Sequence, residues 1–277
     1  MQRRTLLSMP LLLAATRLCA ARPLRVATSF NAVTEIVRAV AGDSLEVIEL
    51  IADGTEPHDF TPTARTLARL RQSDLLVTAG NGMEPWAPAA ARSAGAAQLL
   101  EAAAGFGSEA EPHAWLAPAG VRFMARRIAE RLTALDAARG ELYRRRLADY
   151  TKALDALSDH YRPIFAAAPV KTIVTGHAAF GALCAEFGLQ QKSVEDVFAQ
   201  GEPTARKLAD LARWCRAQNV STIFSETLVS PAVSETLARE AGARVVPIFT
   251  MESSEDGSTL LNRMEKNLKR IEEALFH

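Results

Sequence analysis

The sequence predicts an α/β fold of two lobes, each a mostly parallel sheet flanked by helices, joined by a long rigid backbone helix. Short apolar segments alternate with amphipathic helical segments early in the chain and again after Pro169, which is the pattern of strand–helix–strand units. Between these regions the chain is rich in Ala, Arg, Leu and Glu, with no Gly or Pro between Glu141 and Arg162. The predicted organisation is a signal peptide at 1–21, an N-terminal lobe at 22–120, linking helices at 121–168 and a C-terminal lobe at 169–277.

The first 21 residues have the layout of a secretory signal peptide. Arg3 and Arg4 precede an apolar run of about ten residues, and small residues follow at Ala20 and Ala21. This run is far shorter than the ~20 apolar residues that a membrane-spanning helix needs. We therefore expect an exported protein, and both the general secretory route and the twin-arginine route remain open.

In the predicted N-terminal lobe, strands alternate with helices. The strands are short apolar or alternating segments, and the helices carry apolar residues on one face. The first helix ends at Gly42, a residue that favours helix termini. Strands are expected at 23–29, 45–51 and 74–79, and helices at 32–41 and 63–72.

The middle of the chain predicts two helices, at 118–135 and 138–166. In the second, apolar residues recur at spacings of three to five. A helix of about 25 residues is nearly 40 Å long, at about 1.5 Å per residue. This length exceeds the width of a small domain, so we interpret the helix as a strut between the two lobes.

The alternation of strands and helices resumes in the predicted C-terminal lobe. Its apolar segments are again short, and two of the helical segments end at Gly188 and Gly242. Strands are expected at 171–175, 221–225 and 244–250, and helices at 178–187, 204–218, 231–242 and 260–276.

Composition excludes several classes of protein. The chain has 277 residues, 48% of them hydrophobic, with 32 basic and 32 acidic side chains, which is typical of a globular protein. Zero net charge without a basic stripe argues against a nucleic-acid partner. Three cysteines rule out a disulfide scaffold. We expect Cys184 and Cys215 to be buried thiols on different helices, with a disulfide between them as the alternative.

Three of the five histidines lie where a loop meets a helix or strand. His58 and His113 share the local pattern Glu-Pro-His-x-aromatic, in which proline stiffens the loop that presents the imidazole. His177 follows the strand predicted at 171–175 and opens the next helix, at the carboxyl end of a parallel strand where such sheets bind ligands. His160 and His277 have no such context and are expected to be solvated.

Three imidazoles suit zinc, copper, nickel or iron and argue against an oxygen cage for calcium or magnesium. A fourth ligand is expected from the loop after the last strand, which carries three carboxylates. Glu252 is nearest the strand end, so we predict metal ligands at His58, His113, His177 and Glu252. The alternative for this loop is a solvated acidic segment.

The chain resembles a known family. The two Glu-Pro-His loops, the segment Gly176-His177-Ala178-Ala179-Phe180-Gly181, the long middle helix and the terminal helix are similar to those of the zinc- and manganese-specific solute-binding proteins of bacterial ABC importers. The resemblance covers roughly residues 24–277. In that family the fourth ligand is usually an Asp after an Ile-Phe-Thr-like strand. Here Met251 and Glu252 follow that strand, so Asp256 or a water molecule remains an alternative fourth ligand.

The resemblance implies a function. It implies that His58 and His113 come from the N-terminal lobe and His177 from the C-terminal lobe. The implied protein is not an enzyme but a periplasmic monomer that captures Zn²⁺, with Mn²⁺ as the alternative, between the lobes. It would deliver the metal to an ABC transporter permease in the inner membrane. Three nitrogen ligands favour zinc, and a carboxylate ligand keeps manganese open.

Two other functions remain as hypotheses. A zinc-dependent hydrolase also uses three histidines and a water molecule. The chain has no His-Glu-x-x-His motif to supply its general base, and Glu226 at a strand end is the residue that could be recruited. We assign Glu226 instead to a supporting role behind the ligands or between the lobes. An adhesin-like surface protein is also compatible with the signal peptide.

Overall fold

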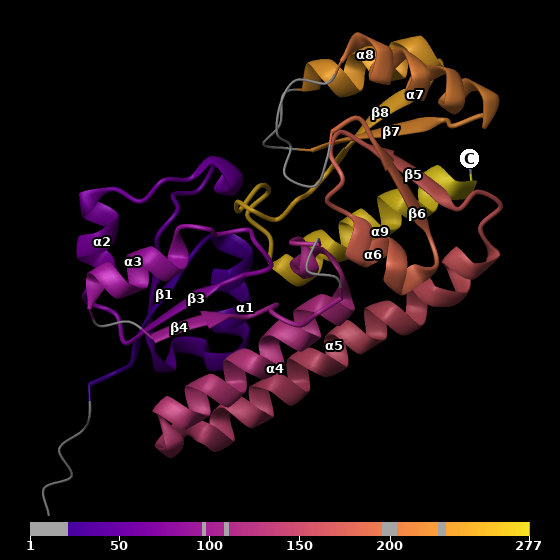
Figure 1. Cartoon of the computed structure of the whole chain (residues 1–277). Coiled ribbons are helices and arrows are strands. Elements are labelled where there is room, and N and C mark those ends of the chain that lie inside the picture. The colour runs from indigo at the N-terminus through magenta and orange to yellow at the C-terminus, as the bar shows by residue number, and fades with distance from the viewer. Residues whose placement is uncertain (1–21, 96–97, 108–110, 196–203, 227–230, 277) are drawn as a thin grey trace, which may run out of the picture.

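The computed structural model describes residues 22–95, 98–107, 111–195, 204–226 and 231–276. The predicted signal peptide at 1–21 and His277 lie outside the described residues. Figure 1 shows two α/β lobes with two long helices running beneath both of them. The predicted fold class is therefore confirmed. The lobe boundaries at 120 and 168 stay a prediction. Among the described residues, no helix combines the length and the apolar character needed to cross a bilayer.

The N-terminal lobe contains a parallel four-stranded sheet in the order β2-β1-β3-β4. Because side chains alternate across a strand, Val26 packs on one face and Ala27 on the other. The first face is covered by α1 and the linking helices, and the second by α2 and α3. The strands are β1 (Arg25–Thr28), β2 (Glu46–Glu49), β3 (Leu75–Thr78) and β4 (Gln98–Glu101), and the helices are α1 (Asn31–Ala41), α2 (Ala64–Leu70) and α3 (Ala87–Ala94).

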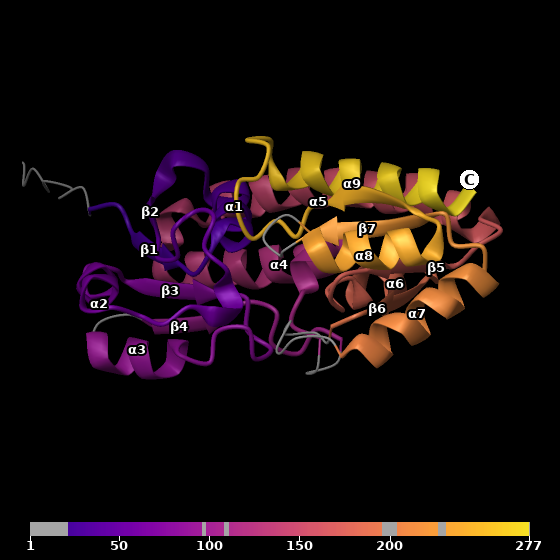
Figure 2. The ribbon, with the colours of Figure 1, turned by 90° about the horizontal axis from the view of Figure 1, so that it is seen from above.

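The C-terminal lobe repeats this arrangement, with a parallel sheet in the order β6-β5-β7-β8. Helices α7 and α8 cover one face, where Val174 and Ile223 are buried. Helices α6 and α9 lie on the other side, toward the linking helices (Figures 1 and 2). The strands are β5 (Thr172–Thr175), β6 (Gln190–Ser193), β7 (Thr222–Glu226) and β8 (Arg244–Ile248), and the helices are α6 (Gly181–Phe187), α7 (Ala205–Ala217), α8 (Pro231–Ala241) and α9 (Leu260–Phe276).

The linking helices α4 (Pro118–Leu135) and α5 (Gly140–Ala167) lie side by side, as both ribbon views show (Figures 1 and 2). Helix α5 has 28 residues and packs against α1 of the N-terminal lobe and against α6 and α9 of the C-terminal lobe. Tyr143, Leu154 and Phe165 are buried along its length. One hydrophobic core therefore runs through both lobes, and α5 is the strut that the sequence predicted.

The structure differs from the sequence prediction at His177. The predicted helix at 178–187 begins only at Gly181, so His177 lies in a bend before α6. Hydrogen bonds hold this bend out of the helix. The Thr175 hydroxyl donates to the His177 carbonyl at 2.6 Å, and the Gln191 amide donates to the same carbonyl at 2.9 Å. The Gln191 side chain also accepts from Phe180 N at 2.9 Å.

Candidate metal centre

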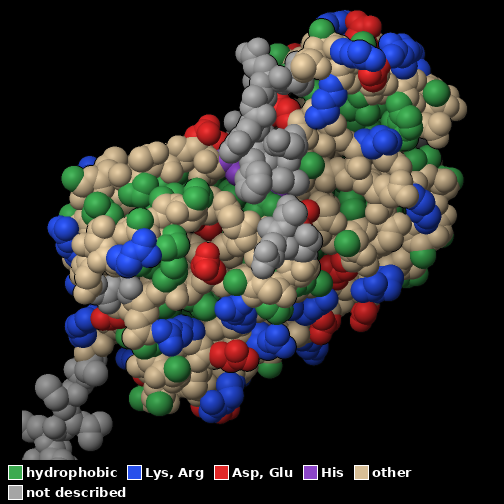
Figure 3. Space-filling view, in the orientation of Figure 1, with side chains coloured by type: hydrophobic (Ala, Val, Ile, Leu, Met, Phe, Trp, Pro, Cys, Tyr) green, Lys and Arg blue, Asp and Glu red, His purple; other side chains and the backbone are tan. Residues whose placement is uncertain are grey.

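The site lies between the lobes, where loops follow the carboxyl ends of strands in both sheets. One ring nitrogen each of His58, His113 and His177 lies within 4.8 Å of the others. In the space-filling view a small area of histidine surface is visible at the boundary between the lobes, while basic and acidic side chains are interspersed along the lower edge (Figure 3). Residues far apart in sequence therefore meet at one buried point.

His58 projects from the loop after β2. It is the middle residue of a one-turn helix, Pro57–Asp59, in which the Glu56 side chain caps the His58 N–H group. Glu56 Oε1 accepts from His58 N at 3.1 Å, which orients the whole turn. The imidazole Nε2 lies 3.2 Å from His113 Nε2.

His113 lies between β4 and α4 and is fully buried. Glu111 Oε1 accepts from His113 N at 3.0 Å and lies 3.3 Å from Nδ1. A carboxylate at Nδ1 favours the tautomer that carries its proton there, which leaves Nε2 free to bind a cation. Burial lowers the pKa of His113 well below its ordinary value, so the ring is neutral. Burial also raises the pKa of Glu111 to about 7.

His177 follows β5 and is 1% exposed. Glu226, at the end of neighbouring β7, accepts from His177 N at 3.2 Å and lies 3.6 Å from Nδ1. Among the described residues, neither ring nitrogen of His177 has a hydrogen-bond partner. The Glu226 carboxylate therefore lies near Nδ1 of His177, as the Glu111 carboxylate lies near Nδ1 of His113. Gly176 makes room for it, because a Cβ at this position would overlap Glu226 Oε2.

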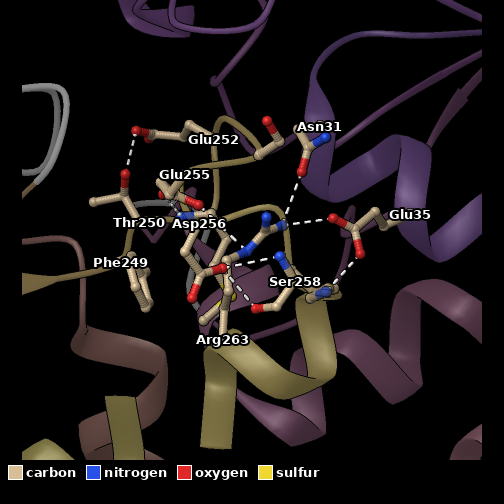
Figure 4. Close-up of polar contacts among 12 residues, drawn as sticks. Asn31, Glu35, Phe249, Thr250, Glu252, Glu255, Asp256, Ser258 and Arg263 are labelled. Atoms are coloured by element: carbon tan, nitrogen blue, oxygen red, sulfur yellow. Dashed lines mark hydrogen bonds and ion pairs between the residues drawn. The ribbon is translucent and has the colours of Figure 1, made fainter. Parts of the chain in front are cut away.

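Glu252 follows β8 and is 4% exposed. Its Oε2 accepts from the Thr250 hydroxyl at 2.7 Å (Figure 4). Its Oε1 lies 3.9 Å from His58 Nε2. Glu56, His58 and Glu252 form a second group whose ligand atoms lie within 4.8 Å of one another. Burial, and then the charge of Glu56, raise the pKa of Glu252 well above its ordinary value. Such a carboxylate is poised to gain from a cation beside it.

Glu252 and Asp256, the two carboxylates of this loop that the sequence offered as a fourth ligand, point in different directions. Asp256 accepts from the Ser258 hydroxyl (Figure 4) and pairs with Lys266 of α9. Glu252 points toward His58. The structure thus brings Glu252 to His58 and leaves Asp256 outside both groups.

Sequence reasoning assigned no role to Glu56 or Glu111. Each is the first residue of a Glu-Pro-His motif, and each accepts the backbone N–H of the histidine two residues later. The repetition of the Glu-Pro-His motif is the feature of the sequence that could have indicated this role. His160 is exposed, as expected. Cys184 and Cys215 are buried free thiols in separate clusters, so the alternative of a disulfide is wrong.

The group has the chemistry of a site for a divalent transition metal. Three imidazoles and one carboxylate match the donor set that zinc takes in proteins. The ring nitrogens of His177 and the Oε1 of Glu252 are buried without a hydrogen-bond partner among the described residues, and such atoms are costly unless a ligand satisfies them. A cation held by the three histidines would bind one of the two His177 nitrogens.

The sequence profile of the family described as ZnuA, zinc-uptake complex component A, periplasmic, matches residues 26–274. The chain belongs to the ZnuA family. This confirms the resemblance to metal-specific solute-binding proteins. The family consists of components of uptake systems and not of enzymes, and nothing among the relatives supports the hydrolase hypothesis.

Two curated relatives are described as zinc proteins. The chain is 30% identical over 280 residues to the high-affinity zinc uptake system protein ZnuA of Bacillus subtilis, covering 91% of this chain and 88% of the relative. It is also 30% identical over 277 residues to the zinc-binding lipoprotein AdcA of Streptococcus pneumoniae. That match covers 90% of this chain but 55% of AdcA, which is a longer protein.

Solved structures of ZnuA relatives share the fold. The Zn(II)-bound ZnuA-like domain of Streptococcus pneumoniae AdcA superposes with a TM-score of 0.80 at 29% identity, covering 92% of this chain and all of that domain. The laminin-binding protein Lmb of Streptococcus agalactiae, described as having adhesin and metal-transporting activity, gives a TM-score of 0.86 at 28% identity. That match covers 91% of this chain and 99% of Lmb.

Proposed function

We propose that this protein captures one zinc ion between its two lobes and delivers it to an ABC transporter permease in the inner membrane. The observation that carries the proposal is the convergence of His58, His113 and His177 from both lobes within 4.8 Å. Zinc here is the transported substrate, and the donor set favours it over manganese. The zinc-bound AdcA domain supports the same choice of metal.

In this proposal the ligands are the three histidines and Glu252. Glu111 and Glu226 orient His113 and His177, so that each ring presents a nitrogen to the ion. Helix α5 packs against both lobes and opposes a wide hinge opening, so zinc entry and release would need only a small rearrangement. A signal peptide at 1–21 would export the chain to the periplasm, where it would act as a monomer.

The decisive experiment removes one proposed ligand. His113→Ala should abolish tight binding of one zinc ion per chain, because it deletes a buried nitrogen donor and leaves a polar cavity. Affinity is measured by competition titration against a fluorescent chelator, and bound metal by elemental analysis of protein purified without added metal. His160→Ala is the matched control, since that ring is exposed on α5, and it should bind zinc as the parent does.

Equal zinc affinity in His113→Ala and the parent would refute the site assignment. Delivery is tested separately, in bacteria that lack their own zinc-binding component. The parent gene should restore growth in zinc-depleted medium, and the His113→Ala gene should not. A parent that binds zinc tightly yet fails to restore growth would argue against delivery to that permease.

A further inference from the structure

The segment after β8 carries Glu252, yet residues of the N-terminal lobe hold it in place. Ser254, two residues after Glu252, donates through its backbone N–H to Asp53 Oδ1 at 2.6 Å and through its hydroxyl to Oδ2 at 2.5 Å. Asp53 lies in the loop between β2 and His58. Both oxygens of one carboxylate thus fix one serine, and the contact joins the loops of two proposed ligands.

A second set of contacts anchors the other end of the segment. Arg263, in the first turn of α9, is fully buried and pairs with Glu35 Oε1 of α1 at 2.6 Å (Figure 4). The same guanidinium lies 3.3 Å from Glu255 Oε2. Glu255 Oε1 in turn accepts from Met251 N at 2.7 Å. These contacts tie the segment to the N-terminal lobe through buried charges.

The backbone beside Glu252 is in a conformation that needs such support. Met251 has φ of +60°, in the left-handed region that residues with a side chain seldom occupy. A residue held there costs free energy, and surrounding contacts must stabilise it. The direction of the Glu252 carboxylate therefore depends on contacts that neither Glu252 nor the histidines make.

We propose that Asp53 is a positioning residue for Glu252: through Ser254 it holds the carboxylate ligand against the loop of His58. This inference rests on the proposed function. Asp53 hydrogen-bonds to Ser254, not to Glu252, and acts through the segment that it fixes. Without this contact, the carboxylate oxygen would spend less of its time within reach of the ion. Partners behind metal ligands contribute about 10- to 100-fold in metal affinity.

A double-mutant cycle tests the proposal. Asp53→Ala should weaken zinc binding about 10-fold in the parent. It should have no further effect when Glu252→Ala is already present, because the carboxylate that Asp53 positions is then gone. Asp53→Asn should retain most of the affinity, since an amide oxygen still accepts from Ser254 N and its NH₂ group can donate to the hydroxyl. The visible absorption of bound Co²⁺ should shift in Asp53→Ala toward the spectrum of Glu252→Ala.

Asp59→Ala is the charge-matched control. Asp59 is an exposed acid in the same loop, and its loss removes one negative charge near the site without touching Ser254. It should leave zinc affinity and the Co²⁺ spectrum unchanged. Because Asp53 is exposed, the metal-free variants should unfold near the parent temperature, which excludes misfolding as the cause.

Two results would overturn the inference. One is parental zinc affinity in Asp53→Ala while Glu252→Ala binds weakly, which leaves the proposed function intact. The other is an equal loss from Asp53→Ala in both backgrounds, which means that Asp53 acts independently of Glu252. If Glu252→Ala itself binds zinc as the parent does, the ligand assignment fails and the inference fails with it.

Discussion

The carboxylate of Glu111 lies against the α-carbon of Gly181, so closely that a Cβ added at Gly181 would overlap Oε2. Glu111 belongs to the N-terminal lobe, and Gly181 begins α6 of the C-terminal lobe. The other oxygen of the same carboxylate contacts His113. A glycine in one lobe therefore makes room for the group that orients a proposed ligand in the other.

Gly181→Ala should weaken zinc binding about 10-fold, because the new methyl group displaces the Glu111 carboxylate from His113. The measurement is competition titration of zinc against a chelator. The same substitution in a Glu111→Ala background should have little further effect, since the displaced group is already absent. Parental affinity in Gly181→Ala would show that Glu111 has another position from which to support His113.

Glu252→Ala removes one anionic oxygen and keeps three imidazoles. Zinc tolerates water in an open position and should bind more weakly but measurably. Manganese depends more on oxygen ligands and should lose proportionally more affinity. Isothermal titration with both metals measures the two losses. Asp256→Ala is the matched control on the same loop, and a larger effect there than at Glu252 would reverse the assignment.

The free energy of unfolding should depend on pH through the titration of Glu84. It is 4% exposed and accepts from the backbone N–H groups of Ala79 and Gly80, both at 2.9 Å. Burial raises its pKa to about 7. The folded protein therefore holds this proton more tightly than the unfolded chain does. The resulting stabilisation is complete below the unfolded pKa of about 4.3 and is lost as the pH rises through about 7.

Glu84→Gln cannot titrate at this position. Relative to the parent, its free energy of unfolding should therefore increase between about pH 5 and about pH 8, by on the order of 3 kcal/mol. Urea unfolding of both metal-free proteins across this range measures the difference. A difference that stays constant with pH would mean that Glu84 titrates alike in the folded and unfolded states.

Cys184 and Cys215 should be unreactive toward alkylating reagents in the folded protein. Burial raises the pKa of Cys184 to about 12 and that of Cys215 to about 11, and the thiolate is the reactive form. Alkylation by iodoacetamide should be slow in native buffer and fast in denaturant. Mass spectrometry without reductant should find Cys184 and Cys215 as free thiols. A mass lower by two hydrogens would reveal a disulfide instead.

Central strands were predictable because both of their faces are buried. Val26 and Ala27 of β1 face two different helical layers, so both must be small or apolar. The edge strands β4 and β6 gave no such pattern, whereas β2 and β8, which also lie at sheet edges, were expected from the sequence. Gln98 of β4 and Gln190 of β6 are exposed, and both strands were missed together with the Ala-rich helix α3. The hydrophobic signal weakens where one side of a strand meets water.

The proposed ligands were predictable for a different reason, since proline stiffens two of their loops and His177 follows a buried strand. The contacts behind them were not predictable. Glu111 meets Gly181, and Asp53 meets Ser254, across the boundary between the lobes. Local pattern carries no information on how two separate sheets are placed relative to each other. The packing of both sheets on α5, together with direct contacts between the lobes such as α1 with α9, fixes those distances.

The four proposed ligands come from loops that follow four different strands, with about 55 to 75 residues between each and the next. In the unfolded chain, gathering them would require three long loops to close at once, at a considerable cost in chain entropy. The denatured state is therefore a poor chelator at this site. Zinc should therefore bind almost exclusively to the native protein. It should raise the free energy of unfolding by nearly the full amount expected for a ligand that does not bind the unfolded chain. Thermal unfolding would then report metal occupancy directly.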